Sequence, residues 1–321
     1  MASSHNVDLL SSGLVVKAAS SEVYNDKLKA EIDQIMALYN IYPDLMVPVL
    51  HDGIASGRRF YILERKDALP LSKIVFDNLR SLAQRRAIVH NALDRIQEAI
   101  KIEISEQDAA PTGDMYSRLL EEWEAIKFIH EVFDKQILLD GTPRSLTGHQ
   151  IIEKALMLSR TEIFSPVEGA HFNFHFGNVL YCEKSDQVNF IDPDCSVRGI
   201  DPLFGLSRFA FSFWHELAME IGDAVKVIPM SDSVMYLLRT SDHRTILNGI
   251  PELASILGLI HWIGEAELKK FFVLTTYCFL RSIRINGSGK QWSIPHSPTI
   301  TQPEEVLMLG LLTYLNDVAI A

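Results

Sequence analysis

The chain has 321 residues, of which 47% are apolar, and a formal net charge of −11. It can bury the core of one large domain or two lobes, and its acidity disfavours nucleic acid or an anionic membrane as the main partner. Three cysteines without metal-ligand spacing, and no signal-peptide pattern, favour a reduced, cytoplasmic location. The apolar stretches 253–263 and 305–314 are too short to span a bilayer, so we expect no membrane segment.

Residues 1–66 predict a small β-rich lobe. Two strand-like segments, Asn6–Leu10 and Leu14–Lys17, flank the turn signal Ser11-Ser12-Gly13. A helix is predicted over 22–39, where apolar side chains recur at helical spacing. These side chains are Leu28, Ile32, Ile35, Met36 and Tyr39, with Glu31 bordering the face that they form.

Two further strands are predicted to complete this lobe, at Met46–Leu50 and Arg59–Leu63. The turn signals Asp52-Gly53 and Ser56-Gly57 lie between them. We place a hinge near 63–68, because the character of the sequence changes there.

Residues 67–321 predict a large helical lobe with one embedded hairpin. The helices are expected at 70–79, 82–104, 115–137, 148–163, 203–221, 231–238, 242–257, 260–284 and 303–318. Pro111 with Gly113, and the run 140–143, are expected to interrupt them.

The hairpin is predicted within 171–192. A polar loop from His171 leads into the apolar segment Val179–Cys182, and a second apolar segment, Gln187–Ile191, ends at Asp192. A hairpin brings its two ends together, so Asn178 and Asp192 should lie close in space. An amide oxygen and a carboxylate that converge in this way suit Mg²⁺, which prefers oxygen ligands and keeps some of its water.

The spacing H-x-N-x-x-x-x-N in this loop resembles a kinase catalytic loop. More specifically, the chain resembles the aminoglycoside phosphotransferase and choline kinase-like family, whose members read H-G-D-x-H-x-G-N-x-L, then I-D, then G-D-P. The matching residues are His171, His175, Gly177, Asn178 and Leu180, then Ile191-Asp192, then Gly199-Ile200-Asp201-Pro202. The resemblance implies a bilobal α+β protein-kinase-like fold, with a β-rich lobe at 1–66 and a helical catalytic lobe at 67–321.

The resemblance also implies how a nucleotide would be held. Lys17 and Glu31 would pair and reach the phosphates of ATP or GTP, and Glu64 would lie at the hinge that receives the base. Ser3 and Ser4 would be the tail of a phosphate-binding loop whose first strand and glycines the sequence does not show.

The family's metal ligands and bracing residues map onto the segment that follows the loop. Asn178 and Asp192 would hold Mg²⁺, with Asp194 either a second carboxylate or a plain surface acid. Asp201 would brace the catalytic loop. Gly205 stands where many relatives have a further acid, which puts part of that bracing in doubt.

One departure bears on catalysis, because Asn173 stands where the family has its catalytic aspartate. An amide can hold a hydroxyl but cannot accept its proton, and a general base contributes roughly 10²- to 10⁴-fold. Three explanations are open. The protein is a weak or inactive relative, it uses another base such as His175 or Asp194, or the residue is a deliberate substitution.

The two histidines of the loop raise a separate hypothesis, that they bind a metal ion. His171 and His175 are four residues apart, the spacing that binds zinc on a helix. They lie in a loop, with Phe172, Phe174 and Phe176 between and after them, and without an obvious third ligand. We therefore expect His171 to pack inside the loop and the phenylalanines to anchor it.

The sequence thus predicts an enzyme that transfers the γ-phosphoryl group of ATP or GTP to a hydroxyl of a small molecule. The acidic chain would suit a cationic molecule as this substrate. The alternative is a pseudokinase, a nucleotide-binding module with little turnover because of Asn173. A protein-substrate kinase ranks last, because no activation segment ending in Ala-Pro-Glu is found.

Overall fold

The computed structural model describes residues 5–77, 79–106, 108, 114–126, 133–139, 141–220, 225–238 and 265–287. The chain divides into two compact units. The first comprises Met1–Gly113 and Ser165–Leu206, and the second comprises Asp114–Phe164 and Ser207–Ala321. The predicted division into lobes at residue 66 stays a prediction.

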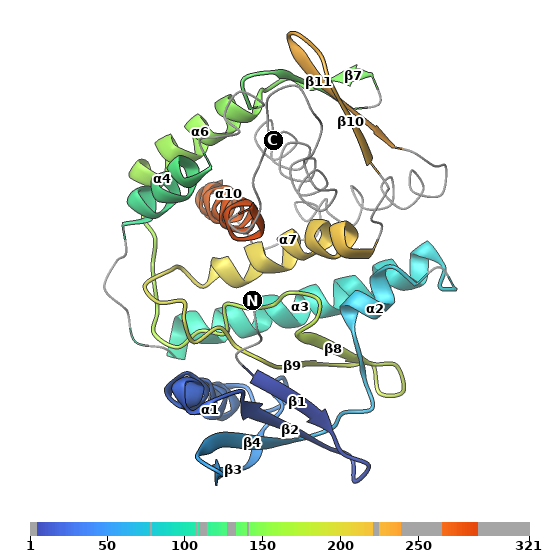
Figure 1. Ribbon diagram of the computed structural model, residues 1–321, viewed down its shortest axis with the longest axis vertical. Helices are drawn as coiled ribbons and strands as arrows, with labels where there is room; N and C mark the ends of the chain where they lie inside the picture. The colour runs from blue at the N-terminus through green and yellow to red at the C-terminus, as the bar shows by residue number, and fades with distance from the viewer. Residues whose placement is uncertain are drawn as a thin grey trace. The chain divides into compact units, whose positions relative to one another are not determined.

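The first unit opens with an antiparallel sheet of order β1-β2-β4-β3 (Figure 1). Its strands are β1 (His5–Leu9), β2 (Leu14–Ala19), β3 (Val49–Ala55) and β4 (Arg58–Glu64). A 3-10 turn at Glu22–Tyr24 leads into helix α1 (Asn25–Ile41), which packs against this sheet. The predicted strand-turn-strand-helix order is therefore confirmed here.

The buried stripe of α1 differs in part from the prediction. Leu28, Ile32 and Ile35 are buried as expected, but Met36 is 52% exposed, Tyr39 is only half-buried, and Leu38 is buried instead. Consecutive residues on a helix lie about 100° apart, so a stripe that contains Ile35 continues at Leu38 and leaves Met36 outside.

The strand predicted at Met46–Leu50 is wrong in its bounds, because β3 runs over Val49–Ala55 and includes Asp52-Gly53. The chain reverses only at Ser56-Gly57, where both residues have positive φ (50° and 76°). That geometry suits a two-residue hairpin whose twist matches its strands. Pairing with β4 therefore overrides the local Asp-Gly turn signal.

The predicted hairpin is confirmed. Strand β8 (Val179–Cys182) pairs antiparallel with β9 (Gln187–Phe190), from Val179 opposite Phe190 to Cys182 opposite Gln187. The two-residue strand β5 (Leu69–Pro70) extends this sheet in the order β5-β8-β9.

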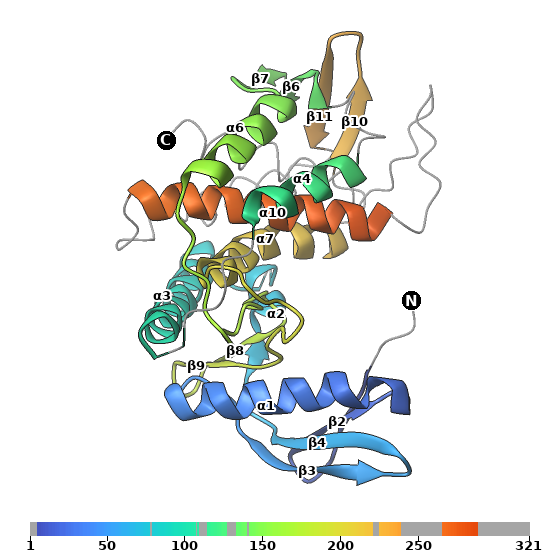
Figure 2. The same cartoon turned by 90° about the vertical axis from the view of Figure 1, so that its left-hand side faces the viewer.

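Two further helices belong to the first unit, α2 (Leu71–Val75) and α3 (Leu82–Glu106). Both contact the hairpin sheet, and α3 also contacts α1 (Figure 2). The loop after α1 is tied to the hairpin as well, because Phe190 N–H donates to Leu45 O (2.6 Å) and Val47 N–H donates to Phe190 O (3.2 Å).

The second unit contains α4 (Met115–Ala125), α6 (Gly148–Thr161) and α10 (Glu265–Gly287), which pack on one another (Figure 2). Helix α7 (Leu203–Glu220) starts in the first unit and continues in the second. A Thr147–Gln150 capping box fixes the start of α6. No helix in the described part of the chain is long and apolar enough to cross a membrane.

This unit also holds a four-stranded sheet that the sequence prediction missed. Its order is β10-β11-β6-β7, with β6 (Gln136–Leu139), β7 (Thr142–Pro143), β10 (Val225–Pro229) and β11 (Ser233–Leu238).

Two predicted helices are corrected by this sheet. The helix predicted at 231–238 is wrong, since these residues form β11, and the helix predicted at 115–137 ends at Ala125. A short apolar run does not distinguish strand from helix by periodicity. The pairing of β11 with the distant β6 decides it. The helices predicted at 242–257 and 303–318 lie outside the described residues.

Candidate functional site

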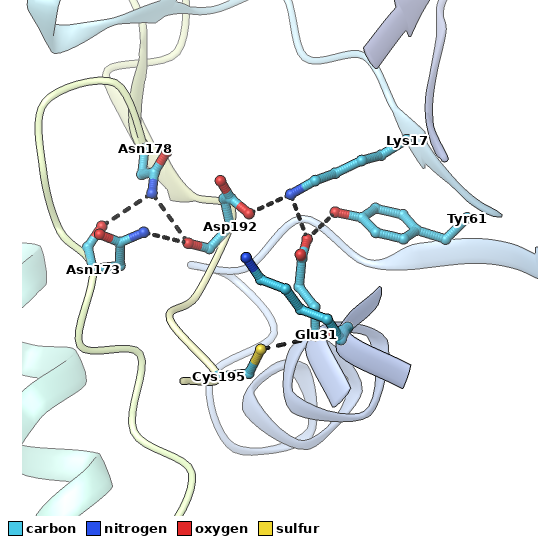
Figure 3. Close-up of polar contacts among 8 residues, drawn as sticks. Lys17, Glu31, Tyr61, Asn173, Asn178, Asp192 and Cys195 are labelled. Carbon is cyan, nitrogen blue, oxygen red and sulfur yellow. Dashed lines mark hydrogen bonds and ion pairs between the residues drawn. The ribbon is translucent and has the colours of Figure 1, made fainter. Parts of the chain in front are cut away.

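One lysine joins two acids that are far apart in the sequence (Figure 3). Lys17 Nζ, from β2, donates to Glu31 Oε1 of α1 (2.7 Å) and to Asp192 Oδ1 after β9 (2.5 Å). The side chains of Lys17 and Glu31 are 12% and 4% exposed, whereas that of Asp192 is 43% exposed. The structure thus brings together three predicted site residues, with the Asp192 carboxylate as the accessible member.

Lys17 and Asp192 stabilise each other's charged form. Burial alone would lower the pKa of Lys17, but Asp192 and Glu31 outweigh it and raise the pKa. Burial would raise the pKa of Asp192, but the Lys17 ammonium lowers it below its usual value. For Glu31, burial prevails over Lys17 and the pKa is raised. Lys17 and Asp192 are therefore both charged at neutral pH.

Tyr61 is a member of the cluster that sequence reasoning missed. Its hydroxyl donates to Glu31 Oε1 (2.5 Å), and the pKa of Tyr61 is raised by burial and by that carboxylate. Tyr61 on β4 stands directly opposite Lys17 on β2. Opposite residues of an antiparallel pair project on the same face, so the strand register, had it been known, would have indicated Tyr61.

The carbonyl of Asp192 collects two amide side chains (Figure 3). Asn173 Nδ2 donates to it at 2.9 Å, and Asn178 Nδ2 donates to it at 3.1 Å and to Asn173 O at 3.2 Å. Asn178 and Asp192 are therefore close in space, as predicted, and the contact joins the Asn178 side chain to the backbone carbonyl of Asp192. Since Asn178 bonds through its nitrogen, its amide oxygen remains as a possible ligand.

The loop is anchored by aromatic rings, as predicted. Phe172, Phe174 and Phe176 are at most 1% exposed, and the His171 ring stacks on Phe174 with centroids 4.3 Å apart. Burial lowers the pKa of His171 to about 3, so the ring is neutral, and its Nδ1 accepts from Asn173 N–H (3.3 Å). Among the described residues, no three His, Cys, Asp or Glu side chains come together as a group that could hold a metal ion.

His175 takes part in the turn that ends the loop. Its Nδ1 accepts from Gly177 N–H (3.0 Å). A Cβ at Gly177 would lie 2.8 Å from the His175 ring, which explains the glycine. With Nδ1 as the acceptor, the proton of the neutral ring lies on Nε2. The one basic nitrogen is therefore already engaged, and this arrangement does not favour His175 as the general base.

Phe172 occupies the position of the glycine in the family pattern that the loop resembles. Its φ of 54° lies in the left-handed region, as does the φ of 57° at Asp192. A bulky residue in that region costs of order 1–3 kcal/mol and persists where its surroundings enforce it. The backbone at Phe172 is therefore strained, whereas an aspartate such as Asp192 tolerates this region.

Gly205 has its own explanation in the structure. A Cβ at this position would lie 2.7 Å and 2.9 Å from two ring atoms of Phe174. The Phe174 ring thus leaves no room for a side chain at position 205.

Asp201 contacts both flanks of the loop region. Its carboxylate accepts from Ser165 N–H (3.0 Å) and from Leu203 N–H at the start of α7 (3.0 Å). These bonds fix the segment that enters the loop region and the helix that follows it.

We expect Gly205→Ala to destabilise the protein by ~1–3 kcal/mol, because the buried Phe174 ring has no room for a methyl group. Helix propensity alone would favour alanine by about 1 kcal/mol, so the sign of the change is informative. Urea denaturation measures it. The double variant Gly205→Ala with Phe174→Leu should lose less than the sum of the single changes. A more stable Gly205→Ala protein would show that the ring moves aside freely.

The remaining predicted residues lie around this centre. Asp194 accepts from Ser196 N–H (3.1 Å) and Ser196 Oγ (2.5 Å), and its own N–H donates to His171 O (3.0 Å). Glu64 is exposed at the end of β4 and accepts from Lys66 Nζ (2.8 Å). Ser3 and Ser4 lie outside the described residues.

The predicted hinge borders a cavity of about 510 Å³. It is lined by residues 65–69 together with Arg80, Tyr181, Glu183 and Lys184. Lys17, Asn178 and Asp192 do not line it, so this cavity is separate from the charged cluster.

No protein-family model and no curated protein matches the chain. Solved structures do. The GDP complex of wild-type aminoglycoside 2'-phosphotransferase-IIIa matches with a TM-score of 0.50 and 12% identity, over 98% of this chain and 91% of that one. The GDP complex of a mutant of the same enzyme matches with a TM-score of 0.51 and 12% identity, over 100% and 89%.

These likenesses show the fold. The chain has the α+β protein-kinase-like fold of the aminoglycoside phosphotransferases, with an antiparallel sheet in its amino-terminal region and helices prominent in the remainder.

Proposed function

We propose that this protein is a Mg²⁺-dependent phosphotransferase of the aminoglycoside phosphotransferase-like family, which moves the γ-phosphoryl group of ATP or GTP to a hydroxyl of a small molecule. One observation carries the proposal. Lys17, held by Glu31, reaches the Asp192 carboxylate at the open end of the hairpin, in a chain with the fold of kinases.

The side chains at the hairpin end fit a magnesium ion. The Asp192 carboxylate and the Asn178 amide oxygen are hard oxygen ligands, and Mg²⁺ is commonly held by one or two such protein groups together with phosphates and water. When bound, the ion would neutralise charge on the phosphate oxygens.

The other residues of the site would position the reactants. Lys17 would exchange part of its contact with Asp192 for the phosphates, while Glu31 and Tyr61 keep its ammonium in place. Asn173 would hold the acceptor hydroxyl. The oxygen of this hydroxyl attacks the γ-phosphorus as the bond from phosphorus to the bridging oxygen breaks. The hydroxyl proton passes to water or to the product phosphate, because the Asn173 amide cannot accept it.

The acceptor that we propose is a small, cationic, hydroxyl-bearing molecule. The matched structures are aminoglycoside phosphotransferases, and the chain carries a net charge of −11. Both were solved with GDP, so GTP should be tested beside ATP. A phosphorylation screen across aminoglycosides, macrolides, nucleosides, sugars and amino alcohols would identify the acceptor. Absence of any phosphorylated product, with intact nucleotide binding, would favour the pseudokinase.

Replacing Lys17 with methionine should weaken Mg-nucleotide binding by at least about tenfold, since a charge-assisted hydrogen bond is worth roughly 1.5–3 kcal/mol. Titration calorimetry with ATP and GTP measures this. Lys29→Met is the matched control, because Lys29 lies on the exposed face of α1, where its ammonium donates to the Asp33 carboxylate (2.9 Å). Equal affinity in both variants would exclude Lys17 from the nucleotide site.

One observation favours the pseudokinase alternative. The Asn173 amide is built into the loop, where it donates to the Asp192 carbonyl. An aspartate could not make this bond. A protein that binds nucleotide without turnover, both as it stands and with Asn173→Asp, would be this module.

A further inference from the structure

Two buried polar side chains grip a single peptide group at the entrance of the catalytic loop. Gln34 Nε2 donates to Ala170 O (2.6 Å), and Glu103 Oε1 accepts from His171 N–H (2.8 Å). The carbonyl of Ala170 and the amide of His171 belong to the same peptide unit. One is therefore held from α1 and the other from α3.

This peptide group stands at a branch point of the site. The His171 carbonyl accepts from Asp194 N–H (3.0 Å), and the His171 ring accepts from Asn173 N–H (3.3 Å). Fixing His171 therefore constrains both the loop that carries Asn173 and the segment that carries Asp192. The next residue, Phe172, has the positive φ of 54°, a conformation that its surroundings must enforce.

Holding a backbone amide with Glu103 costs folding stability. Glu103 is fully buried in α3, its Oε2 atom has no hydrogen-bond partner, and its Oε1 atom accepts a second bond from Tyr42 OH (2.8 Å). A buried acid with an unsatisfied oxygen costs stability, and an apolar residue would fit a helix core more cheaply. Packing alone therefore does not account for an acid at this position.

Gln34 connects the same peptide group to the nucleotide side of the site. It lies three residues after Glu31 on α1, on the same face of the helix. Helix α1 thus presents Glu31 to Lys17 and Gln34 to Ala170. A shift of this helix would move the phosphate-binding lysine and the catalytic loop together.

We propose that Gln34 and Glu103 are positioning residues that clamp the Ala170–His171 peptide group and so set the geometry of Asn173 and Asn178 at Asp192. The proposal rests on the phosphotransferase function inferred above. It assigns a catalytic consequence to two buried residues that contact neither the nucleotide-binding lysine nor the proposed metal ligands.

The protonation of Glu103 supplies a readout that a packing residue would lack. Burial raises its pKa to about 7, against the opposing effect of the His171 and Tyr42 hydrogen bonds. The other titratable groups at this carboxyl do not change charge near neutral pH, since burial lowers the pKa of His171 to about 3 and raises that of Tyr42. A raised pKa favours the folded protein at low pH, and this contribution is lost as the pH rises through about 7.

Four variants test the clamp. Glu103→Leu and Gln34→Leu each remove one grip, and Glu103→Gln keeps the acceptor oxygen but abolishes the titration. Tyr42→Phe is the matched control, because it removes the other bond to the same carboxylate and leaves the bond to His171. Two measurements apply to each: amide hydrogen exchange of segment 170–178, and kcat and KM for Mg-dependent nucleotide turnover.

We expect both leucine variants to exchange segment 170–178 at least about tenfold faster and to lose about tenfold or more in kcat, with KM for nucleotide nearly unchanged. Tyr42→Phe should leave both quantities near those of the parent protein. Glu103→Gln should keep kcat near that of the parent protein. It should also lack the fall in the free energy of unfolding that the parent protein shows as the pH rises towards 7. If Glu103→Leu does not fold, Gln34→Leu provides the same comparison.

The clamp is overturned if neither leucine variant changes the exchange of segment 170–178, or if Tyr42→Phe changes it as much as they do. These outcomes are separate from those of the proposed function. Absence of turnover both in the parent protein and in Asn173→Asp would refute the phosphotransferase, and hydrogen exchange alone would then decide whether the clamp exists.

Discussion

Replacing Asn173 with aspartate is expected to raise phosphoryl transfer by about 10²-fold, the lower part of the range for a positioned general base. The loose transition state of phosphoryl transfer makes the base less important than in acyl transfer. Single-turnover transfer of labelled γ-phosphate to an acceptor from the screen measures the gain, and slow nucleotide hydrolysis provides a second measurement.

The same substitution should cost stability. Asn173 Nδ2 donates to the Asp192 carbonyl at 2.9 Å, and a carboxylate oxygen in its place would face another oxygen. The loss is expected to be about 1–3 kcal/mol, unless the new acid rotates towards the acceptor. A faster but less stable variant would show that Asn173 stabilises the loop and makes phosphoryl transfer slower.

Asn173→Ala is the control for this experiment, because it loses the same hydrogen bond without gaining a base. It should also lose stability, without the added repulsion between two oxygens, and show no gain in rate. An equal rate in the aspartate and alanine variants, with nucleotide still bound, would contradict the assignment of position 173 to the acceptor hydroxyl.

Replacing Asp192 with asparagine is expected to weaken Mg-dependent nucleotide binding by about 100-fold and to abolish measurable turnover, because the accessible carboxylate of the cluster is lost. Asparagine has nearly the shape of aspartate and tolerates the left-handed φ of 57° at this position. Titration of nucleotide at several magnesium concentrations separates a loss of metal binding from a loss of folding.

Asp186→Asn gives a matched control at the other end of the same hairpin. Asp186 has a φ of 55°, and its carboxylate accepts from Tyr181 OH (2.7 Å) and Asn91 Nδ2 (2.9 Å), away from the cluster. Its nucleotide affinity should stay near that of the parent protein. If both variants bind Mg-nucleotide as the parent does, Asp192 is not the metal ligand and the site lies elsewhere.

Local signals were sufficient where the structure is local. The hairpin at 179–190 follows from two apolar runs around a polar turn, and α1 follows from its periodic apolar residues. They failed where strand pairing overrides them. Strand β11 is an apolar run that pairs with β10 and with β6, which lies far back in the chain, and the Asp-Gly signal in β3 yields to pairing with β4.

For the candidate site, the spacing of His171, Asn173, Asn178 and Asp192 placed the loop and its proposed metal ligands, and the order of strand and helix pointed to Lys17 and Glu31. The supporting residues carry no such pattern. Tyr61 and Glu103 look like ordinary members of a strand and a helix until the register and the packing bring them to Glu31 and His171.

The sequence by itself determined which residue types meet at the hairpin, because a short hairpin fixes its own ends, and it determined that position 173 offers an amide in place of a base. Only the tertiary structure decided that Lys17 also contacts Asp192, that Phe174 fills the space at Gly205, and that Gln34 and Glu103 share one peptide group. These contacts join segments that are far apart along the chain, so no periodic pattern in the sequence marks them, and only the packing of these segments brings them together.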